Sequence, residues 1–461
     1  LAFFADVSPY ALPHRRDAKF HSLWDISPPE VQQRREQIER QLEATRNKRR
    51  EIEQIAIAKM EAELQRRSET RERKDVVKNH LAEHLNDQQL REHQSLAAVV
   101  QQLKAELAEL PAPELYLSLA KSEAHPAAMH VMVRGNPHAK GEHVDPHYPV
   151  LFGDATPQIP PADEDARSAG RRIVLAKWIA SPENPLTSRV IVNRVWQHHF
   201  GRGIVRSANN FGQLGTWPTH PELLDWLAHW LVQHDWRLKP LHRLIVTSNT
   251  YRMSSLAQPD ALARDPENDL FWRFDMRRLS AEEIRDSVLL TTGQLNDQVY
   301  GPSIYPKLSQ EVLHTQSRPG DGWHTSEPRE AARRSVYIHV KRSLVPPSLA
   351  NFDFPDPDLS CAARFNTTQA AQALNLLHGE FLQSHAEHLA NRVKNEAGSD
   401  LQAQVVHALR LVMQREPEQD TLLESLQLAQ GYQSEHQLSP DEALRQFCLM
   451  ALNLNEFIYL D

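Results

Sequence analysis

The stretch NPLTSRVIVNRVWQHHFGRGIVRSANNFGQLGTWPTHPELLDWL, residues 184–227, decides how the second half of this chain folds. Asn184 followed by Pro185 is typical of a helix start, with Asn as the N-cap and Pro at the first helical position. Gly201 is typical of the left-handed residue that follows a helix. We therefore predict a helix between Asn184 and Gly201. The glycines after it allow tight turns and a close approach of the backbone to another group.

Both faces of this predicted helix mix apolar and polar residues. Asn193 and Gln197 share one face, and Trp196 and His199 share another. If both flanks pack, Asn193 and Arg194 lie in a buried or half-buried cluster, together with the histidine that follows Gln197. An unsatisfied group there costs about 1–3 kcal/mol. The stretch is therefore either a satisfied structural core or a binding or catalytic site, and the pattern leaves both interpretations open.

Three further segments carry the capping-box pattern, in which a hydroxyl residue is followed three positions later by Glu. They are Thr219–Glu222, Ser280–Glu283 and Ser439–Glu442. The hydroxyl accepts from the backbone N–H of the third residue, and the Glu side chain bonds back to the cap N–H. Each pattern precedes apolar residues at helical spacing. Residues 162–461 are therefore predicted to form a multi-helix domain.

Residues 28–110 have the composition of long helices. Glu, Gln, Arg, Lys, Ala and Leu dominate, and residues 30–110 contain neither Pro nor Gly. The apolar heptad is interrupted at Thr45 and Arg49, and it weakens over residues 68–78 and 85–89. We predict a helical spacer, either an intramolecular hairpin or a dimerising coiled coil, and we favour the hairpin.

Residues 111–161 change character. Alternating Val and Met in AMHVMVRGNP, followed by closely spaced turn residues, predict a small β-rich element and a Pro-rich linker. His138, His143 and His147, with Asp145, fit either a metal site or ordinary turn chemistry around the prolines, and we favour the turns. The predicted fold class is mainly α, with this element between the spacer and the helical domain.

The bulk composition excludes several classes of function. The 461 residues carry 60 acidic and 52 basic side chains, a net charge of −8, and no unbroken basic block, which argues against a nucleic-acid partner. No apolar run approaches the roughly 18 residues of a membrane span. Cys361 and Cys448 are the only cysteines, so no CxxC or CxxCH motif exists for thiolate zinc or covalent haem. The 24 histidines show no HExxH spacing, and we predict neither a metal nor a cofactor in this segment.

Several motifs from His130 to Asp461 resemble a known family. They are HVMVRGNPHAKGEHVDPHYPVLF, NPLTSRVIVNRVWQHHFGRGIV, FGQLGTWPTHPELLDWLA, LKPLHRLIVTSNTYRMSS, LSAEEIRDSVL, GPSIYP, FDFPDPD, NTTQAAQALNLLHGEF and ALNLNEFIYLD. In order and spacing they resemble the planctomycete-specific domain family of unknown function. This resemblance implies a C-terminal fragment of a large exported protein, periplasmic or at the cell surface, whose missing N-terminal region holds cytochrome-c-like haem c domains. Residues 1–27 would then be the tail of an upstream domain.

Two functions are compatible with these residues. The first is a non-catalytic helical binding or scaffold module for a glycan, a protein, or its own upstream haem-containing domains; no known catalytic motif opposes it. The second is an enzyme acting on a polar or anionic substrate, with carbohydrate as one candidate, in which His198 or His242 transfers protons. The candidate binding residues are Arg189, Asn193, Arg194, Gln197, His198, Arg202, Asn210 and Arg243.

The acidic run NFDFPDPDLS is a further candidate. Asp353, Asp356 or Asp358 could assist such an enzyme, or their oxygens could bind Ca²⁺. The run lacks an EF-hand pattern, however, and we favour an Asp-Pro turn.

Overall fold

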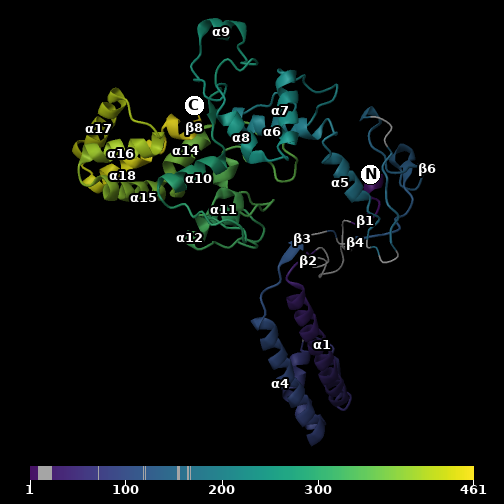
Figure 1. Ribbon diagram of the computed structural model, residues 1–461. Helices are drawn as coiled ribbons and strands as arrows, with labels where there is room; N and C mark the ends of the chain where they lie inside the picture. Colours follow the sequence, from purple (N-terminus) through teal and green to yellow (C-terminus); the bar gives the residue numbers. More distant parts are fainter. Residues whose placement is uncertain are drawn as a thin grey trace. The chain divides into compact units, whose positions relative to one another are not determined.

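The computed structural model describes residues 1–8, 23–70, 72–117, 119, 121–152, 156–163, 166 and 168–460. Helices dominate, and the sheets of the described residues have two strands each, which confirms the mainly α fold class (Figure 1). The chain divides into two compact units, residues 1–181 and 182–461. Most of the predicted N-terminal tail and parts of the predicted linker, residues 9–22, 153–155, 164–165 and 167, lie outside the described residues.

The predicted spacer is a helical hairpin in the first unit. Helix α1 (Pro29–Ile57) packs along α4 (Asp87–Glu109), as Figure 1 shows. Ile38 and Leu42 of α1 meet Val100 and Leu103 of α4 in a buried apolar seam. The end of α2 at Ser68 and the gap before α4 fall at the predicted weak points, whereas the end of α1 at Ile57 does not. The short elements between the two long helices are α2 (Ala62–Ser68), α3 (Arg73–His80) and η2 (Leu81–His84).

The polar interruption of the heptad also has a structural explanation. Arg49 donates from Nε to His93 Nε2 at 3.0 Å and lies 3.4 Å from Oε1 of the buried Glu53. Arg73 donates to the other oxygen of Glu53 at 3.2 Å. Because each charged group has a partner, the desolvation cost of burying Glu53 is offset. The hairpin therefore tolerates a charged residue where the heptad calls for an apolar one.

Short antiparallel strand pairs make up the rest of the first unit. Two of the strands come from residues 1–27, so these residues pair with the β-rich element. The sequence patterns indicated strands only within residues 111–161, so these two strands were not predicted. The pairs are β1 (Val7–Ser8) with β4 (Lys121–Ser122), β2 (Leu23–Asp25) with β3 (Leu115–Leu117), and β5 (His130–Met132) with β6 (Lys140–His143); the helical elements are η1 (Ala2–Phe4), η3 (Val133–Gly135), η4 (Val150–Phe152) and α5 (Arg171–Ile179).

The histidines in and near the β5–β6 strand pair have separate local contacts. His143 lies 3.7 Å from Asp145, and the backbone N–H of His138 donates to the Asn136 side chain at 3.0 Å. In the described part of the chain, no three His, Cys, Asp or Glu side chains are grouped closely enough to hold a metal ion.

The second unit contains two apolar cores. The first surrounds the helix that the sequence predicted, with Trp196, Phe200 and Leu231 buried in it. Its elements are α6 (Thr187–Phe200), α7 (Pro221–Gln233), α8 (Leu238–Val246) and α9 (Pro259–Arg264). Leu241 and Ile245 of α8 are buried in this core. Strand β7 (Arg277–Arg278) follows, and it pairs with β8 (Tyr459–Leu460).

The second core lies among the remaining long helices, which Figure 1 draws in green to yellow. Val288, Leu389, Leu409 and Phe447 are fully buried there. The elements are α10 (Ala281–Thr291), α11 (Gln310–His314), α12 (Pro328–Ala331), η5 (Ser335–Tyr337), α13 (Pro347–Ala350), α14 (Ala370–His378), α15 (Glu380–Ala397), α16 (Leu401–Met413), α17 (Gln419–Ser434), α18 (Pro440–Ala451) and α19 (Asn455–Ile458).

The predicted helix starts meet different outcomes. The Ser280–Glu283 and Ser439–Glu442 capping boxes are present at α10 and α18. The Thr219–Glu222 box is wrong: α7 begins at Pro221 with His220 as its cap, because the Thr219 N–H donates to the Ile204 carbonyl instead. Asn184 accepts from the N–H groups of residues 186 and 187, so the helix begins two residues later than predicted.

Two of the buried arginines in the second unit, Arg333 and Arg285, each bind two or more carbonyl oxygens. The Arg333 side chain is 0% exposed; its guanidinium donates to the carbonyls of Gln298 (3.2 Å), Tyr300 and Pro302 (3.1 Å). Arg285 donates to the carbonyls of Arg333 (2.9 Å) and Ala331. One arginine thus holds the loop over residues 298–302, and the other holds the segment that carries Arg333.

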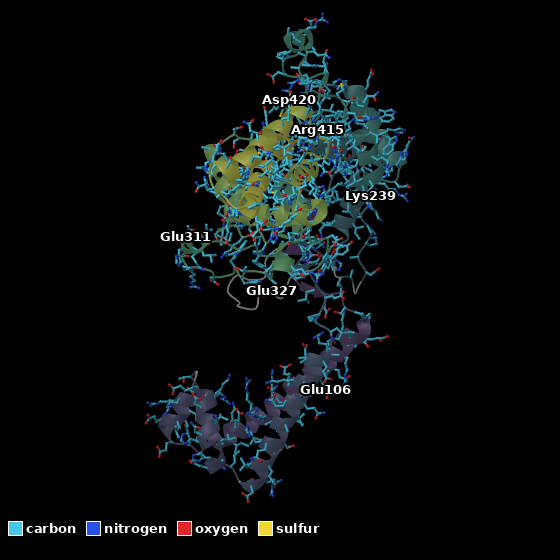
Figure 2. The ribbon with its side chains drawn as sticks, turned by 90° about the vertical axis from the view of Figure 1, so that its left-hand side faces the viewer. Glu106, Lys239, Glu311, Glu327, Arg415 and Asp420 are labelled. Atoms are coloured by element: carbon cyan, nitrogen blue, oxygen red, sulfur yellow. The ribbon has the colours of Figure 1, made fainter. Side chains whose placement is uncertain are left out.

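The outer surface carries charges of both signs. Lys239, Glu311, Glu327, Arg415 and Asp420 are exposed and project outward (Figure 2). Within the described residues, no helix combines the length and the apolar composition that a membrane crossing needs.

Burial of one histidine makes stability depend on pH. His385 of α15 bonds through Nδ1 to the Phe381 carbonyl at 2.8 Å, and burial lowers its pKa from 6.5 to about 4. As pH falls from about 6.5 to 4, the unfolded chain therefore takes up a proton before the folded chain does, and up to about 3 kcal/mol of stability is lost. Urea unfolding at pH 7 and 4.5 should show a smaller loss for His385→Asn, whose amide can keep the Phe381 bond. Equal losses in the two proteins would contradict this assignment.

Candidate functional site

Asn193 is the most buried of the predicted site residues, at 0% exposure. Its Nδ2 donates to the Val205 carbonyl at 2.9 Å, and its Oδ1 accepts from the Val205 N–H at 2.8 Å. The side chain thus pairs with a main-chain residue as a neighbouring strand would. Gly203 is required here, because a Cβ at that position would lie 2.6 Å from Asn193 Nδ2. Asn193 therefore fixes the path of the loop that leaves α6.

Three arginines of the predicted site also hold local structure. Arg189 joins α6 to α7 through Asp225. Arg194 donates to Asn209 Oδ1 at 2.6 Å. Arg202 pairs with Asp275 at 2.9 Å and donates to two carbonyls of the loop at residues 267–268. These guanidinium groups are engaged with the protein itself.

The remaining candidates lie further apart. Gln197 donates to the Ala362 carbonyl at 3.2 Å, and Asn210 accepts from the Gly212 N–H at 3.0 Å within its own turn. Arg243 is exposed on α8, and its side chain has no polar partner within the described residues. The structure therefore does not bring all the predicted residues into one cavity.

Two of the histidines contact each other at the C-terminal end of α6. His199 Nε2 lies 2.8 Å from His242 Nδ1, so one ring donates the shared proton and the other accepts it. Burial lowers the pKa of His199, and the charge of His242 lowers it further. The 2.8 Å contact itself requires that only one of the two facing nitrogens carries a hydrogen.

His198 lies on the exposed side of α6, which differs from the buried or half-buried position expected for it. Partial burial lowers its pKa, and the charges of Arg364 and Arg194 add to this effect. Arg364 is itself held by two bonds to Glu282, at 2.6 and 2.8 Å. His198 is therefore a neutral base beside cationic groups at neutral pH.

The acidic residues of the run NFDFPDPDLS, residues 351–360, mainly make contacts that stabilise the local fold. Asp353 pairs with Arg278 at 2.6 Å and accepts from the N–H and Oγ1 of Thr367. Burial raises the pKa of Asp353, but these hydrogen bonds outweigh it and the net shift is downward. Asp356 closes a turn by accepting from the Asp358 N–H at 2.8 Å. These contacts agree with the favoured Asp-Pro turn. The Asp353 carboxylate is already bonded to Arg278 and Thr367.

Sequence reasoning missed the exposed apolar side chains of the loop that Asn193 and Arg194 hold in place. Leu214 is 95% exposed and Trp217 is 90% exposed, while Ile204 and Val205 at the start of the same loop are buried. Ser207 and Thr216 close the loop base through a 2.8 Å bond from the Thr216 N–H to Ser207 Oγ. The available signal was the Trp in GQLGTW, between two glycines and a proline, to which the sequence analysis assigned no role. We call residues 207–217 the tryptophan loop.

Comparison with known proteins places these features in a family. A family model described as a protein of unknown function (DUF1553) matches residues 171–429, more than half of the chain. The chain belongs to the DUF1553 family. The DUF1553 region includes α6, the tryptophan loop and the histidine pair, and it begins beyond the helical hairpin. Neither the curated proteins nor the solved structures give a match.

Proposed function

We propose that this chain is a non-catalytic helical binding module, in which the α6 region is a scaffold that presents the tryptophan loop to a glycan. The observation that carries the proposal is how the polar side chains of α6 are used. Asn193 and Arg194 bond to Val205 and Asn209 of the chain that follows α6, at 2.9 and 2.6 Å, and the side chains of Leu214 and Trp217 in the loop are left exposed. A rigid loop with exposed aromatic and aliphatic groups is typical of a recognition surface.

The chemistry of the loop favours a sugar. Trp217 offers a flat apolar ring with an N–H at its edge, which suits the C–H face of a pyranose. Asn209 and Asn210 use their oxygens inside the protein, so their amide N–H groups remain to donate to hydroxyls. Gln213 is exposed beside them. Neutral donors around an exposed ring match an uncharged saccharide better than an ionic ligand.

Replacing Trp217 with alanine should abolish glycan binding without unfolding the protein. The ring is almost fully exposed, so its loss removes ligand contact but little packing. A thermal-shift and calorimetric screen with soluble neutral oligosaccharides would measure both effects; we expect at least a tenfold weaker affinity and an unchanged Tm. Trp226→Ala is the matched control, because Trp226 is 53% exposed on α7, outside the loop. Equal affinity of Trp217→Ala and wild type would reject the proposal.

A second candidate function rests on His198. A neutral imidazole beside Arg364 and Arg194 could accept a proton from a polar or anionic substrate held by those cations. Because His198 is exposed, His198→Ala should remove turnover while leaving stability near that of wild type. If the same oligosaccharide screen shows hydrolysis that this variant loses, the chain is an enzyme.

The wider setting is part of the same proposal. The motifs shared with the planctomycete-specific family support a longer exported protein, periplasmic or at the cell surface, whose upstream domains carry haem c and are partners of this module. Native protein from the source cells would test this setting. We expect peptides of this chain in the periplasmic or surface fraction, on a band that also stains for covalent haem. A cytoplasmic band without haem would contradict it.

A further inference from the structure

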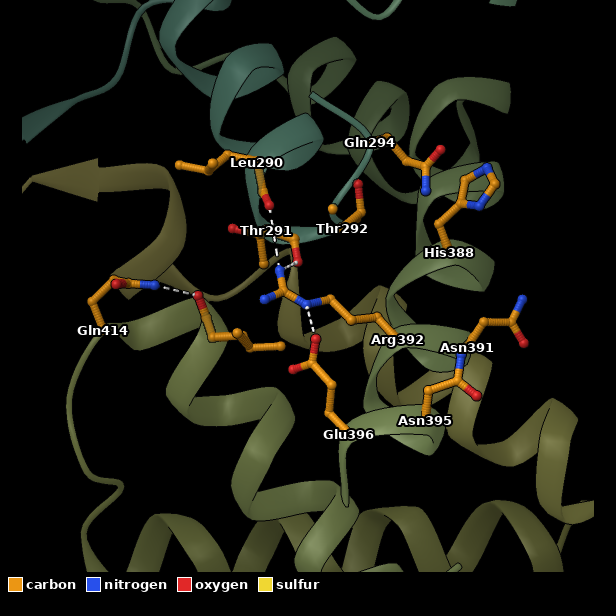
Figure 3. A pocket seen from close by; sticks show the side chains of 12 residues that line it. Leu290, Thr291, Thr292, Gln294, His388, Asn391, Arg392, Asn395, Glu396 and Gln414 are labelled. Atoms are coloured by element: carbon orange, nitrogen blue, oxygen red, sulfur yellow. Dashed lines mark hydrogen bonds and ion pairs between the residues drawn. The ribbon is translucent and has the colours of Figure 1, made fainter. Parts of the chain in front are cut away.

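A hollow lies at the core formed around Val288 and Leu389, away from the tryptophan loop. It is formed by the end of α10 together with α15 and α16, and its volume is about 810 Å³ (Figure 3). We call it the amide groove, because side-chain amides from three separate segments line it. These are Gln294 after α10, Asn391 and Asn395 on α15, and Gln414 after α16.

The charged residues of the amide groove neutralise each other. Arg392 donates from Nη1 to the Thr291 carbonyl at 2.8 Å, which caps the end of α10, and from Nε to Glu396 at 2.8 Å (Figure 3). The second oxygen of Glu396 lies 2.6 Å from His407 Nε2. The Arg392 and His407 bonds lower the pKa of Glu396, so it stays ionised and paired. The groove therefore has no uncompensated charge for an ionic ligand.

The groups that remain for a ligand stand in one row. His388, Asn391 and Asn395 follow helical spacings of three and four, so they share one face of α15. All three are exposed, and none has a hydrogen-bond partner among the described residues. In Figure 3 His388 lies beside Gln294, and Asn391 and Asn395 follow it along α15. Each amide offers both donors and an acceptor, as a peptide group does.

The spacing of this row matches an extended polypeptide. Asn391 and Asn395 are one turn apart, which is about 6 Å along the helix axis. Alternate residues of an extended strand are about 6.6 Å apart, and their peptide groups point to the same side. Two asparagine amides at this spacing can each bond both the N–H and the C=O of alternate residues.

The far end of the groove is apolar. Leu290 is 63% exposed there, and Leu411 is half-buried beside it. The lining contains no Phe, Tyr or Trp on which a sugar ring could stack. An apolar side chain of a peptide would cover Leu290, whereas a hydroxylated ring would leave it exposed.

We propose that the amide groove binds an extended, uncharged peptide segment of a partner protein. The amides of Asn391 and Asn395 bond its backbone, and one aliphatic side chain packs on Leu290 and Leu411. The proposal is independent of glycan binding at the tryptophan loop, because the two surfaces share no residue.

The test uses the full chain and a displayed library of linear dodecapeptides. Binders are selected on the wild type after depletion on Asn391→Leu/Asn395→Leu, synthesised with a fluorescent label, and measured by anisotropy. We expect uncharged sequences with a recurrent aliphatic residue. Their affinity should fall at least tenfold for the double variant and for peptides N-methylated at alternate residues, which lack the N–H donors. Asn249→Leu is the matched control, since Asn249 is exposed outside the groove.

Three results would overturn the proposal. One is failure of the selection to give any binder that the double variant loses while its Tm stays at the wild-type value. Another is unchanged affinity of the N-methylated peptides, which would remove backbone recognition. The third is binding of a neutral oligosaccharide that Asn391→Leu abolishes, which would assign the groove to a glycan. If the double variant unfolds, Asn391→Ser and the N-methylated peptides provide the same comparison on folded protein.

Discussion

Replacing Asn193 with alanine should lower the free energy of unfolding by about 2–5 kcal/mol. The substitution removes both partners of a buried main-chain residue, the N–H and the C=O of Val205, and each orphaned group costs about 1–3 kcal/mol. Water cannot easily replace the amide, because the side chain is 0% exposed. Urea or guanidinium unfolding followed by circular dichroism measures this loss.

The neighbouring polar residues provide the controls. Arg194→Ala breaks one bond, 2.6 Å to Asn209, at a half-exposed position, so we expect a loss below about 1 kcal/mol. The expected losses therefore differ, although the sequence placed both residues in the same cluster. A loss at Asn193 no larger than at Arg194 would mean that the Val205 pairing does not hold the loop. In that case the tryptophan loop would have no fixed scaffold.

Replacing Arg333 should be as damaging, and lysine should not rescue it. The guanidinium serves three carbonyls that lie in different directions, at residues 298, 300 and 302. A lysine ammonium keeps the charge but lacks the planar fork, so it leaves carbonyls without donors in a fully buried site. We expect Arg333→Lys and Arg333→Met each to cost about 3–5 kcal/mol in unfolding free energy.

The next residue is a matched control for this prediction. The Arg334 side chain is 61% exposed and pairs with Asp286 at 3.4 Å. Exposed pairs contribute about 0–1 kcal/mol, so Arg334→Lys should be close to neutral. If Arg333→Lys keeps wild-type stability, the charge alone is sufficient and the directional role of the guanidinium is wrong.

Local signals predicted much of the fold. Gly201 ends α6 in the left-handed conformation, with φ of 78°, and the serine boxes cap α10 and α18 as expected. These signals depend on residues within one helical turn of each other, which a sequence displays directly. Thr219 was misassigned because its backbone bonds to Ile204, fifteen residues earlier, and no local pattern shows such a contact.

The candidate site was less predictable, because the role of each polar side chain there depends on partners that are distant in the sequence. The sequence showed that Asn193 had apolar neighbours, but it did not show that Val205 would satisfy both of its groups. The same residue types are consistent with a ligand or with a backbone partner. Trp217 was given no position from the sequence, and the short closed loop holds its side chain outside.

The β7–β8 pair has a consequence for how the protein is made. Leu460 packs against the core around α6, while Phe457 and Ile458 are buried in the other core of the same unit. The last described residues therefore contribute to both cores, and the rest of the α6 core comes from residues 191–274, which leave the ribosome much earlier. Contacts so distant in sequence form late, since the intervening chain must first be synthesised and closed into a loop. Until then the edge of the α6 core that Leu460 covers stays open, and we expect this core to be completed only after β8 has been synthesised.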